Sequence, residues 1–331
     1  MTKDKHTLFR MARSSLLGAG LALVAALPAH ADDAYPNKPI HIVVPYTPGG
    51  AVDIVTRLVT PKMGEILKQS IIVDNRPGAA TNIGMDYVTR QPADGYTLLT
   101  ASPSLSSNGA LFTNLHFDPA KAFAPVGEIG YAPLVVVVPA ASPYKTLKDL
   151  MDDGRAHPEK LSFGTAGNGS SGHLAGELLK AEGKFNATHI PYKGGSPAIT
   201  DLLGGRLAFM PINPLEVISH LKSGSLRALA VLDAKPAALL PDVPTAAQQG
   251  VPGAQAAVWW GLEGPAGMPQ AVVDKLNAAL QAALADPMVQ SRMADLGATL
   301  TPGSAADFGT FVANETVKWT KVIKAADIKA D

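Results

Sequence analysis

The segment Leu161–Leu179 constrains the fold of this chain more than any other. An apolar run at Leu161–Phe163 leads into a turn rich in glycine, serine and asparagine, and a helix begins near His173 with apolar residues at helical spacing. This order directs the unpaired N–H groups of the first helical turn, and the positive end of the helix dipole, at one point. The segment therefore favours an α/β fold in which a strand-to-helix turn binds an anion.

The preceding part of the chain repeats this plan. A strand at Ile40–Val44 leads through a Pro-Tyr-Thr-Pro-Gly-Gly turn into a helix from about Ala51, and further strands are expected at Ile71–Asp74 and Tyr96–Thr100. Pro61 predicts a kink or a new helical start, and residues 105–125 are expected to be irregular. Strands that alternate with helices at this spacing predict mostly parallel sheets flanked by helices.

The chain is expected to cross twice between two domains. The uniformly aliphatic run Leu134–Val138 predicts a buried central strand at the first crossing, and Val258–Leu262 carries the chain back. This predicts one domain from residues 32–133 and 255–331 and a second from residues 134–254. Three helices, at about Gln270–Leu284, Pro287–Leu296 and Ala305–Ala326, are expected to cover the first domain.

The first 31 residues have the features of a secretory signal peptide. A basic start is followed by the apolar run Leu16–Leu27 and by Ala29-His30-Ala31, which fits an A-x-A cleavage site. The apolar run is too short for a membrane span. The chain has no cysteine, which excludes disulfides, thiolate metal sites and lipidation at a cysteine. We therefore expect cleavage after Ala31 and export to a bacterial periplasm.

Charge argues against a nucleic-acid partner. Removal of residues 1–31 takes away four of the 28 basic residues and one of the 28 acidic residues, which leaves 24 against 27. No basic patch for nucleic acid or for a membrane surface stands out in the mature chain.

Enzyme and cofactor signatures are weak. Gly167–Gly172 matches G-x-G-x-x-G, but Tyr192 stands where a dinucleotide site needs an acidic residue about twenty positions on. The chain has no G-x-S-x-G nucleophile elbow, and its six mature histidines show no H-E-x-x-H and no ligand cluster. The sequence therefore predicts no catalysis, no cofactor and no metal site.

Motifs spread in order along the mature chain resemble the Bug family, the periplasmic solute-binding proteins of tripartite tricarboxylate transporters. The motifs are VPYTPGG at 44–50, NRPGA at 75–79, DGYTLL at 94–99, the glycine-rich turn and helix at 164–179, PYKGG at 191–195, TDLLGG at 200–205, LPDVPT at 240–245 and GPAG at 264–267. The resemblance implies a type II periplasmic-binding-protein clamshell (a Venus flytrap) that binds a small carboxylated molecule. Glu263 departs from it, because relatives more often have an apolar or small residue there.

The predicted site lies between the turns Tyr46–Asp53 and Thr165–His173. Asp53 could equally complement its helix dipole, and Tyr46 and Tyr192 could equally pack rather than line the cleft. Neither turn contains arginine or lysine, and Lys193 is expected at the rim. We therefore expect backbone N–H groups and neutral side chains to hold a ligand carboxylate. The predicted ligand-binding residues are Tyr46, Thr47, Gly49, Gly50, Asp53, Ser102, Ser104, Thr165, Asn168, Gly169, Ser170, Ser171, His173, Tyr192 and Asn213.

Two functions stay open. The first is a binding protein, expected to be a monomer, that hands its ligand to the membrane components of a tripartite tricarboxylate transporter. The second is a ligand-binding module for a periplasmic sensor. The sequence does not choose among citrate-like, amino-acid, aromatic and linear dicarboxylate ligands.

Overall fold

The computed structural model describes residues 35–192 and 194–330. The predicted signal peptide and Lys193 lie outside these ranges. Contacts divide the chain into residues 1–37 and a much larger unit, residues 38–331, which carries all the elements below. Within the described ranges, no helix combines the length and apolarity that a membrane span requires.

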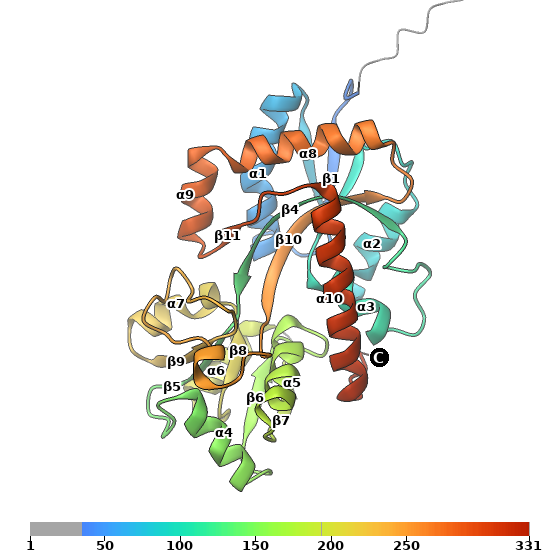
Figure 1. The fold of residues 1–331 in the computed structure, drawn as a ribbon. Coiled ribbons are helices and arrows are strands. Elements are labelled where there is room, and N and C mark those ends of the chain that lie inside the picture. Colours follow the sequence, from blue (N-terminus) through green and yellow to red (C-terminus); the bar gives the residue numbers. More distant parts are fainter. Residues whose placement is uncertain (1–34, 193, 331) are drawn as a thin grey trace, which may run out of the picture. The chain divides into compact units, whose positions relative to one another are not determined.

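A six-stranded sheet is the larger of the sheets in the described residues (Figure 1). Its strand order is β11-β4-β10-β3-β1-β2. The strands are β1 (Ile40–Val44), β2 (Ile71–Asn75), β3 (Thr97–Ala101), β4 (Phe123–Pro133), β10 (Ala257–Pro265) and β11 (Thr299–Leu300). Strand β1 pairs in parallel with β2 and β3, and β10 pairs antiparallel with β3 and β4. Strands β1 to β4 therefore run one way, and β10 and β11 run the other.

Two smaller sheets come from the middle of the chain. One has the order β8-β5-β9, and the other pairs β6 with β7 in parallel. A parallel bridge between Phe163 and Phe209 links β6 to the residue before β8. The valines of β5 are fully buried, as their aliphatic run predicts. The strands are β5 (Val135–Pro139), β6 (Ser162–Thr165), β7 (Thr188–Pro191), β8 (Met210–Ile212) and β9 (Leu226–Val231).

Helices follow most strands, as the alternating pattern predicts. The helices are α1 (Ala51–Leu67), α2 (Asn82–Thr89), α3 (Pro103–Leu111), α4 (Leu147–Ala156), α5 (Ser171–Gly183), α6 (Gly195–Leu203), α7 (Pro214–Lys222), α8 (Gln270–Leu284), α9 (Pro287–Asp295) and α10 (Ala305–Ala325), with short 3₁₀ turns at Ala79–Thr81 and Ala247–Gln249. This α/β architecture confirms the predicted fold class, although the three-stranded sheet is antiparallel, because β5 pairs antiparallel with both β8 and β9.

Of two local predictions, the first is wrong, and for the second the new helical start at Pro61 is excluded while the kink stays a prediction. Residues 105–125 are not irregular throughout, because α3 occupies their start and β4 begins at Phe123. Ser102 supplies an extended N-cap and Pro103 the first helical position, where the missing N–H of proline costs nothing. Helix α1 also does not restart at Pro61 but continues through it to Leu67.

The chain passes once from the larger sheet to the smaller sheets and once back, and the two connecting segments lie next to each other. Leu134 connects β4 to β5, and its N–H donates to the carbonyl oxygen of Ala256, just before β10. These are the two expected crossings. The division into two domains at residues 134 and 254 stays a prediction.

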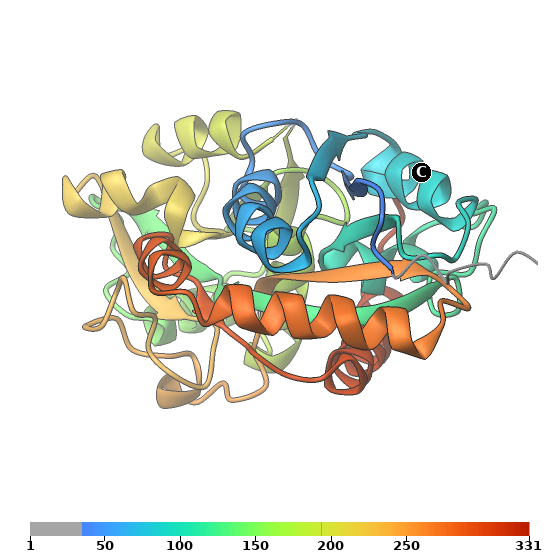
Figure 2. The ribbon, with the colours of Figure 1, turned by 90° about the horizontal axis from the view of Figure 1, so that it is seen from above.

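Helix α10 does more than cover the larger sheet. Near its start, the ring of Phe308 packs edge-on against Trp259 of β10, with centroids 5.9 Å apart. Further along, Trp319 and Ile323 join the hydrophobic cluster that contains Leu134. Figure 1 shows α10, in red, running from the level of α8 to that of α5, and Figure 2 gives the same elements from above. The helix thus packs against β4 of the larger sheet and also contacts α5, which follows β6 of the smaller sheets.

Candidate ligand-binding site

A cavity of about 310 Å³ lies where several helices begin. The first residues of α1 and α3 line it from the side of the six-stranded sheet, and the first residues of α5, α6 and α7 line it from the side of the smaller sheets. Leu134 and Val258 contribute from the two connecting segments. The lining residues are Tyr46, Thr47, Gly50, Ala51, Val52, Ser102, Pro103, Leu134, Ala166, Ser170, Ser171, Gly172, Gly195, Met210, Pro211, Ile212, Asn213, Glu216 and Val258.

Backbone N–H groups at these helix starts are the main polar donors of the cavity. Helices α1 and α6 have no side-chain cap, and the cap of α5 accepts only from His173. In the first turns of α1, α5 and α6, five lining residues have N–H groups that no hydrogen bond within the described residues engages. They are Ala51, Val52, Ser171, Gly172 and Gly195. Such groups, with the helix dipoles behind them, favour an anion.

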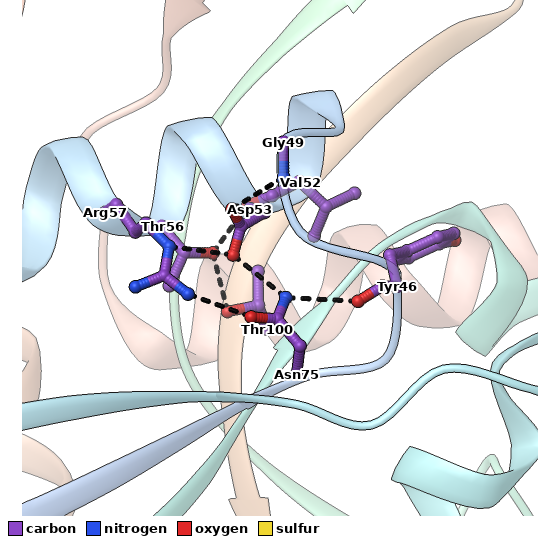
Figure 3. Close-up of polar contacts among 8 residues, drawn as sticks. All are labelled: Tyr46, Gly49, Val52, Asp53, Thr56, Arg57, Asn75 and Thr100. Carbon is purple, nitrogen blue, oxygen red and sulfur yellow. Dashed lines mark hydrogen bonds and ion pairs between the residues drawn. The ribbon is translucent and has the colours of Figure 1, made fainter.

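Asp53 fixes the turn that leads into α1 (Figure 3). The residue is only 3% exposed, and each of its bonds to the Gly49 N–H, Arg57 Nε and Asn75 Nδ2 measures 2.9 Å. Burial of the carboxyl raises its pKa, but these donors outweigh burial, so the net pKa of Asp53 is lowered. Asn75 also donates to the carbonyl oxygen of Tyr46. The carboxylate therefore holds the turn together and takes the Gly49 N–H away from any ligand.

A chain of hydroxyl groups supports the α3 side of the cavity. The hydroxyl of Tyr46 lies 2.8 Å from that of Ser102, and Ser102 lies 3.0 Å from Ser104. Thr81 donates to Ser104 from the strained 3₁₀ turn that precedes α2. Burial raises the pKa of Tyr46, so its hydroxyl stays protonated at neutral pH and can donate.

The turn into α5 depends on two glycines. Gly167 and Gly169 have φ values of 135° and 71°, in the region that glycine adopts more readily than other residues. The Gly169 N–H donates to Nδ1 of His173, and the side chain of Ser170 caps α5 by accepting from the His173 N–H. These bonds fix the turn and leave the N–H groups of Ser171 and Gly172 facing the cavity region.

Two histidines, His173 buried and His189 half-buried, lie beside this turn. The rings of His173 and His189 stack with centroids 3.6 Å apart, and Thr165 Oγ1 lies 2.6 Å from Nε2 of His189. Burial, then the neighbouring charges of His189 and Lys180, lower the pKa of His173 to about 3. Burial and Lys180 lower the pKa of His189 to about 4. Both rings are therefore neutral at pH 7, and His173 accepts the Gly169 N–H as a neutral imidazole.

Seven of the predicted ligand-binding residues line the cavity. They are Tyr46, Thr47, Gly50, Ser102, Ser170, Ser171 and Asn213. The others support the turns or lie away from the lining. Gly49, Asp53, Ser104, Thr165, Gly169 and His173 take part in the contacts above, Asn168 is exposed in the turn, and Tyr192 donates its hydroxyl to Asp201.

Sequence reasoning missed the rest of the lining. Met210–Ile212 form a short strand beside α5, and Gly172 lies so close to the Pro211 carbonyl that a side chain there would clash with it. Glu216 stands in the first turn of α7, where an acidic residue looks like an ordinary complement to the helix dipole. Only the fold brings these residues to the cavity.

The lining has one charged side chain, that of Glu216, and no arginine, lysine or histidine among its described residues. Glu216 stays accessible to solvent, but the protein around its carboxyl displaces enough water to raise its pKa. Among all the described residues, no group of three or more His, Cys, Asp or Glu residues is arranged to hold a metal ion. The cavity is suited to binding a small solute through backbone donors and apolar walls.

This fold, with a cavity between its two sets of strands, is that of the periplasmic binding proteins. The periplasmic binding protein BugD is 33% identical and superposes with a TM-score of 0.75, over 89% of this chain and 99% of BugD. The model of the tripartite tricarboxylate transporter receptor family matches residues 55–328. The chain therefore belongs to that family, in agreement with its resemblance to the Bug proteins.

Two further solved relatives contain carboxylates. The R. palustris protein Rpa4515, solved with adipate, is 35% identical with a TM-score of 0.78, over 89% of this chain and 99% of its own. MatC from Rhodopseudomonas palustris, solved with bound malate, is 31% identical with a TM-score of 0.75, over 87% of this chain and all of its own.

Proposed function

We propose that the mature chain binds a small carboxylated molecule in this cavity and delivers it, chemically unchanged, to a tripartite tricarboxylate-type membrane transporter. The observation that carries the proposal is the group of five helix-start N–H donors that no described residue engages, around a cavity whose described lining contains no basic side chain. The carboxylates in the relatives Rpa4515 and MatC support the ligand class, and the family description supports the transport partner.

The donors are sufficient for useful affinity. A hydrogen bond to a charged group contributes about 1.5–3 kcal/mol. Each helix terminus adds roughly 0.3–1 kcal/mol, and up to about 2 kcal/mol where it is partly buried. A few of these contacts together reach the roughly 8 kcal/mol of a micromolar complex after association costs. A salt bridge to Lys193 is not needed for binding.

Proline variants at the starts of α1 and α5 remove one backbone donor each, and they also replace the lining side chains of Ala51 and Ser171, so Ser171→Ala is measured beside Ser171→Pro to separate the hydroxyl from the N–H. Ala51 and Ser171 are the first residues of α1 and α5, where proline fits the helix and removes one N–H. Ala51→Pro and Ser171→Pro should each weaken carboxylate binding by about tenfold in calorimetry. Ala305→Pro, at the same position of α10 but away from the cavity, is the matched control and should bind normally.

The measurement starts with a panel of succinate, malate, adipate, citrate, benzoate and glutamate against the mature protein. If no carboxylate binds at millimolar concentration, the proposal is wrong. If a carboxylate binds but both proline variants retain full affinity, the helix starts do not hold it.

The transport role needs a cellular test. Deletion of the gene in the producing bacterium should abolish uptake of the radiolabelled ligand, and expression in trans should restore it. Normal uptake together with loss of a ligand-dependent transcriptional response would instead identify a sensor module.

A further inference from the structure

Among the described residues that line the cavity, Glu216 is the one with a charged side chain. The other lining residues are neutral, and the donors that face them are backbone N–H groups and hydroxyl groups. A cavity meant for carboxylates thus contains a carboxylate of its own.

The carboxyl group of Glu216, on α7, lies against the start of α6 in the cavity lining. Its Oε2 atom lies so close to Gly195 that a Cβ atom added to that glycine would be only 2.3 Å from it. No hydrogen bond or ion pair within the described residues engages this carboxyl group. The N-terminus of α7 does not need it either, because the side chain of Asn213 already accepts from the Leu215 N–H.

We propose that Glu216 is a specificity residue that selects solutes carrying a carboxylate at one end and an ammonium group at the other, as amino acids and ω-amino carboxylates do. The proposal rests on the proposed function, since it assumes that the solute carboxylate binds at the unpaired N–H groups of α1 and α5. The second end of the solute then faces the start of α6 and α7, where Glu216 lies.

Electrostatics favours this assignment. A second carboxylate at that end would meet a like charge, and no lining side chain among the described residues could compensate it. An ammonium group would meet an opposite charge and an acceptor that no described residue engages. The protein around Glu216 disfavours its charged form, and a bound ammonium group would relieve that cost.

Matched ligand pairs make the test direct. Succinate and 4-aminobutyrate have the same number of carbon atoms and one carboxylate in common, and so do adipate and 6-aminohexanoate. Calorimetry with the mature protein should show tighter binding of an amino member than of its dicarboxylate partner. The variant Glu216→Gln should lose about tenfold or more for that amino ligand and should bind the dicarboxylates equally well or better.

Two controls separate selectivity from other effects. Glu159→Gln makes the same charge change at an exposed position outside the cavity lining and should leave both affinities unchanged. The thermal midpoint of Glu216→Gln reports any effect on folding.

The outcomes are distinguishable. If dicarboxylates bind more tightly than their amino partners to the wild type, or if Glu216→Gln changes both affinities by the same factor, Glu216 does not select the solute and the proposed function stands. If neither the pairs nor any other carboxylate binds, the proposed function itself fails.

Discussion

Replacement of Asp53 by asparagine tests how the turn into α1 is built. The change keeps the size of the side chain and removes its charge. The carboxylate accepts from three donors, namely the Gly49 N–H, Arg57 Nε and Asn75 Nδ2. Asparagine has one oxygen atom, and its NH₂ group must face at least one of those donors.

The magnitude follows from that mismatch. A buried donor left without an acceptor costs about 1–3 kcal/mol. Loss of a negative charge from the first turn of the helix costs a further 0.3–1 kcal/mol or so. Arg57 is half-exposed and can turn to water, which limits the penalty. We therefore expect Asp53→Asn to lower the free energy of unfolding by about 1–4 kcal/mol, out of the roughly 5–15 kcal/mol typical of native proteins.

Urea denaturation at pH 7 measures this difference, and pH provides an internal check. The pKa of Asp53 is lowered in the folded state, so its stabilisation is present above its unfolded pKa of about 3.9 and is lost as the pH falls through the folded value. The gap between wild type and variant should therefore shrink toward pH 3. Asp274→Asn, on the exposed face of α8, is the control and should cost less than about 0.5 kcal/mol. Equal stability of Asp53→Asn and wild type at pH 7 would refute the reasoning.

Three further predictions concern buried polar groups. Thr165→Ala should lower the free energy of unfolding by about 1–3 kcal/mol in urea denaturation, because the hydroxyl contacts both His189 and the Gly167 N–H. Thr165→Ser keeps a hydroxyl and should recover most of that loss. Equal losses for the two variants would contradict this. Burial raises the pKa of Glu263 to about 8, so the stability of the wild type should fall as the pH rises from about 4 to about 8. The stability of Glu263→Gln relative to the wild type should rise over the same range. A stability difference that stays constant from pH 5 to 8 would contradict this. Burial and Lys180 lower the pKa of His189 to about 4, so the free energy of unfolding of the wild type should fall as the pH is lowered from about 6.5 to about 4. If the stability of His189→Gln falls equally steeply over this range, this histidine is not a cause.

Much of the fold could be predicted because its signals are local. The strand Ile40–Val44 and the helix Gln270–Leu284 have the predicted bounds, since an apolar run and a 3.6-residue period need no distant partner. Helix α3 was missed because its apolar pattern is weak and only the Ser-Pro start marks it. The contact of Trp319 with the cluster around Leu134 was also missed, because periodicity identifies the apolar face of α10 but not the surface that it meets.

The site was predictable to the extent that it consists of turns. Glycine-rich segments before helices identified the Tyr46 and Ser170 sides of the cavity. They did not reveal which polar groups form hydrogen bonds within the protein and are therefore not available to a ligand. The hydroxyl of Tyr192 could be placed in the cavity as readily as against Asp201, since both positions suit a tyrosine that follows a proline.

The difference between Gly49 and Ala51 shows why such sites need a structure. Both residues lie in the turn that the sequence assigns to the ligand, and both have a backbone N–H. The Gly49 N–H donates to Asp53, four residues ahead, whereas that of Ala51 has no partner within the described residues. An acidic residue at a helix start can therefore accept from the turn before the helix, as Asp53 does, and so remove one donor from the ligand. It can also make no bond to its own helix start and line the cavity instead, as Glu216 does. The sequence shows an acid in the first turn in both cases, and only the packing of one helix start against another decides between them.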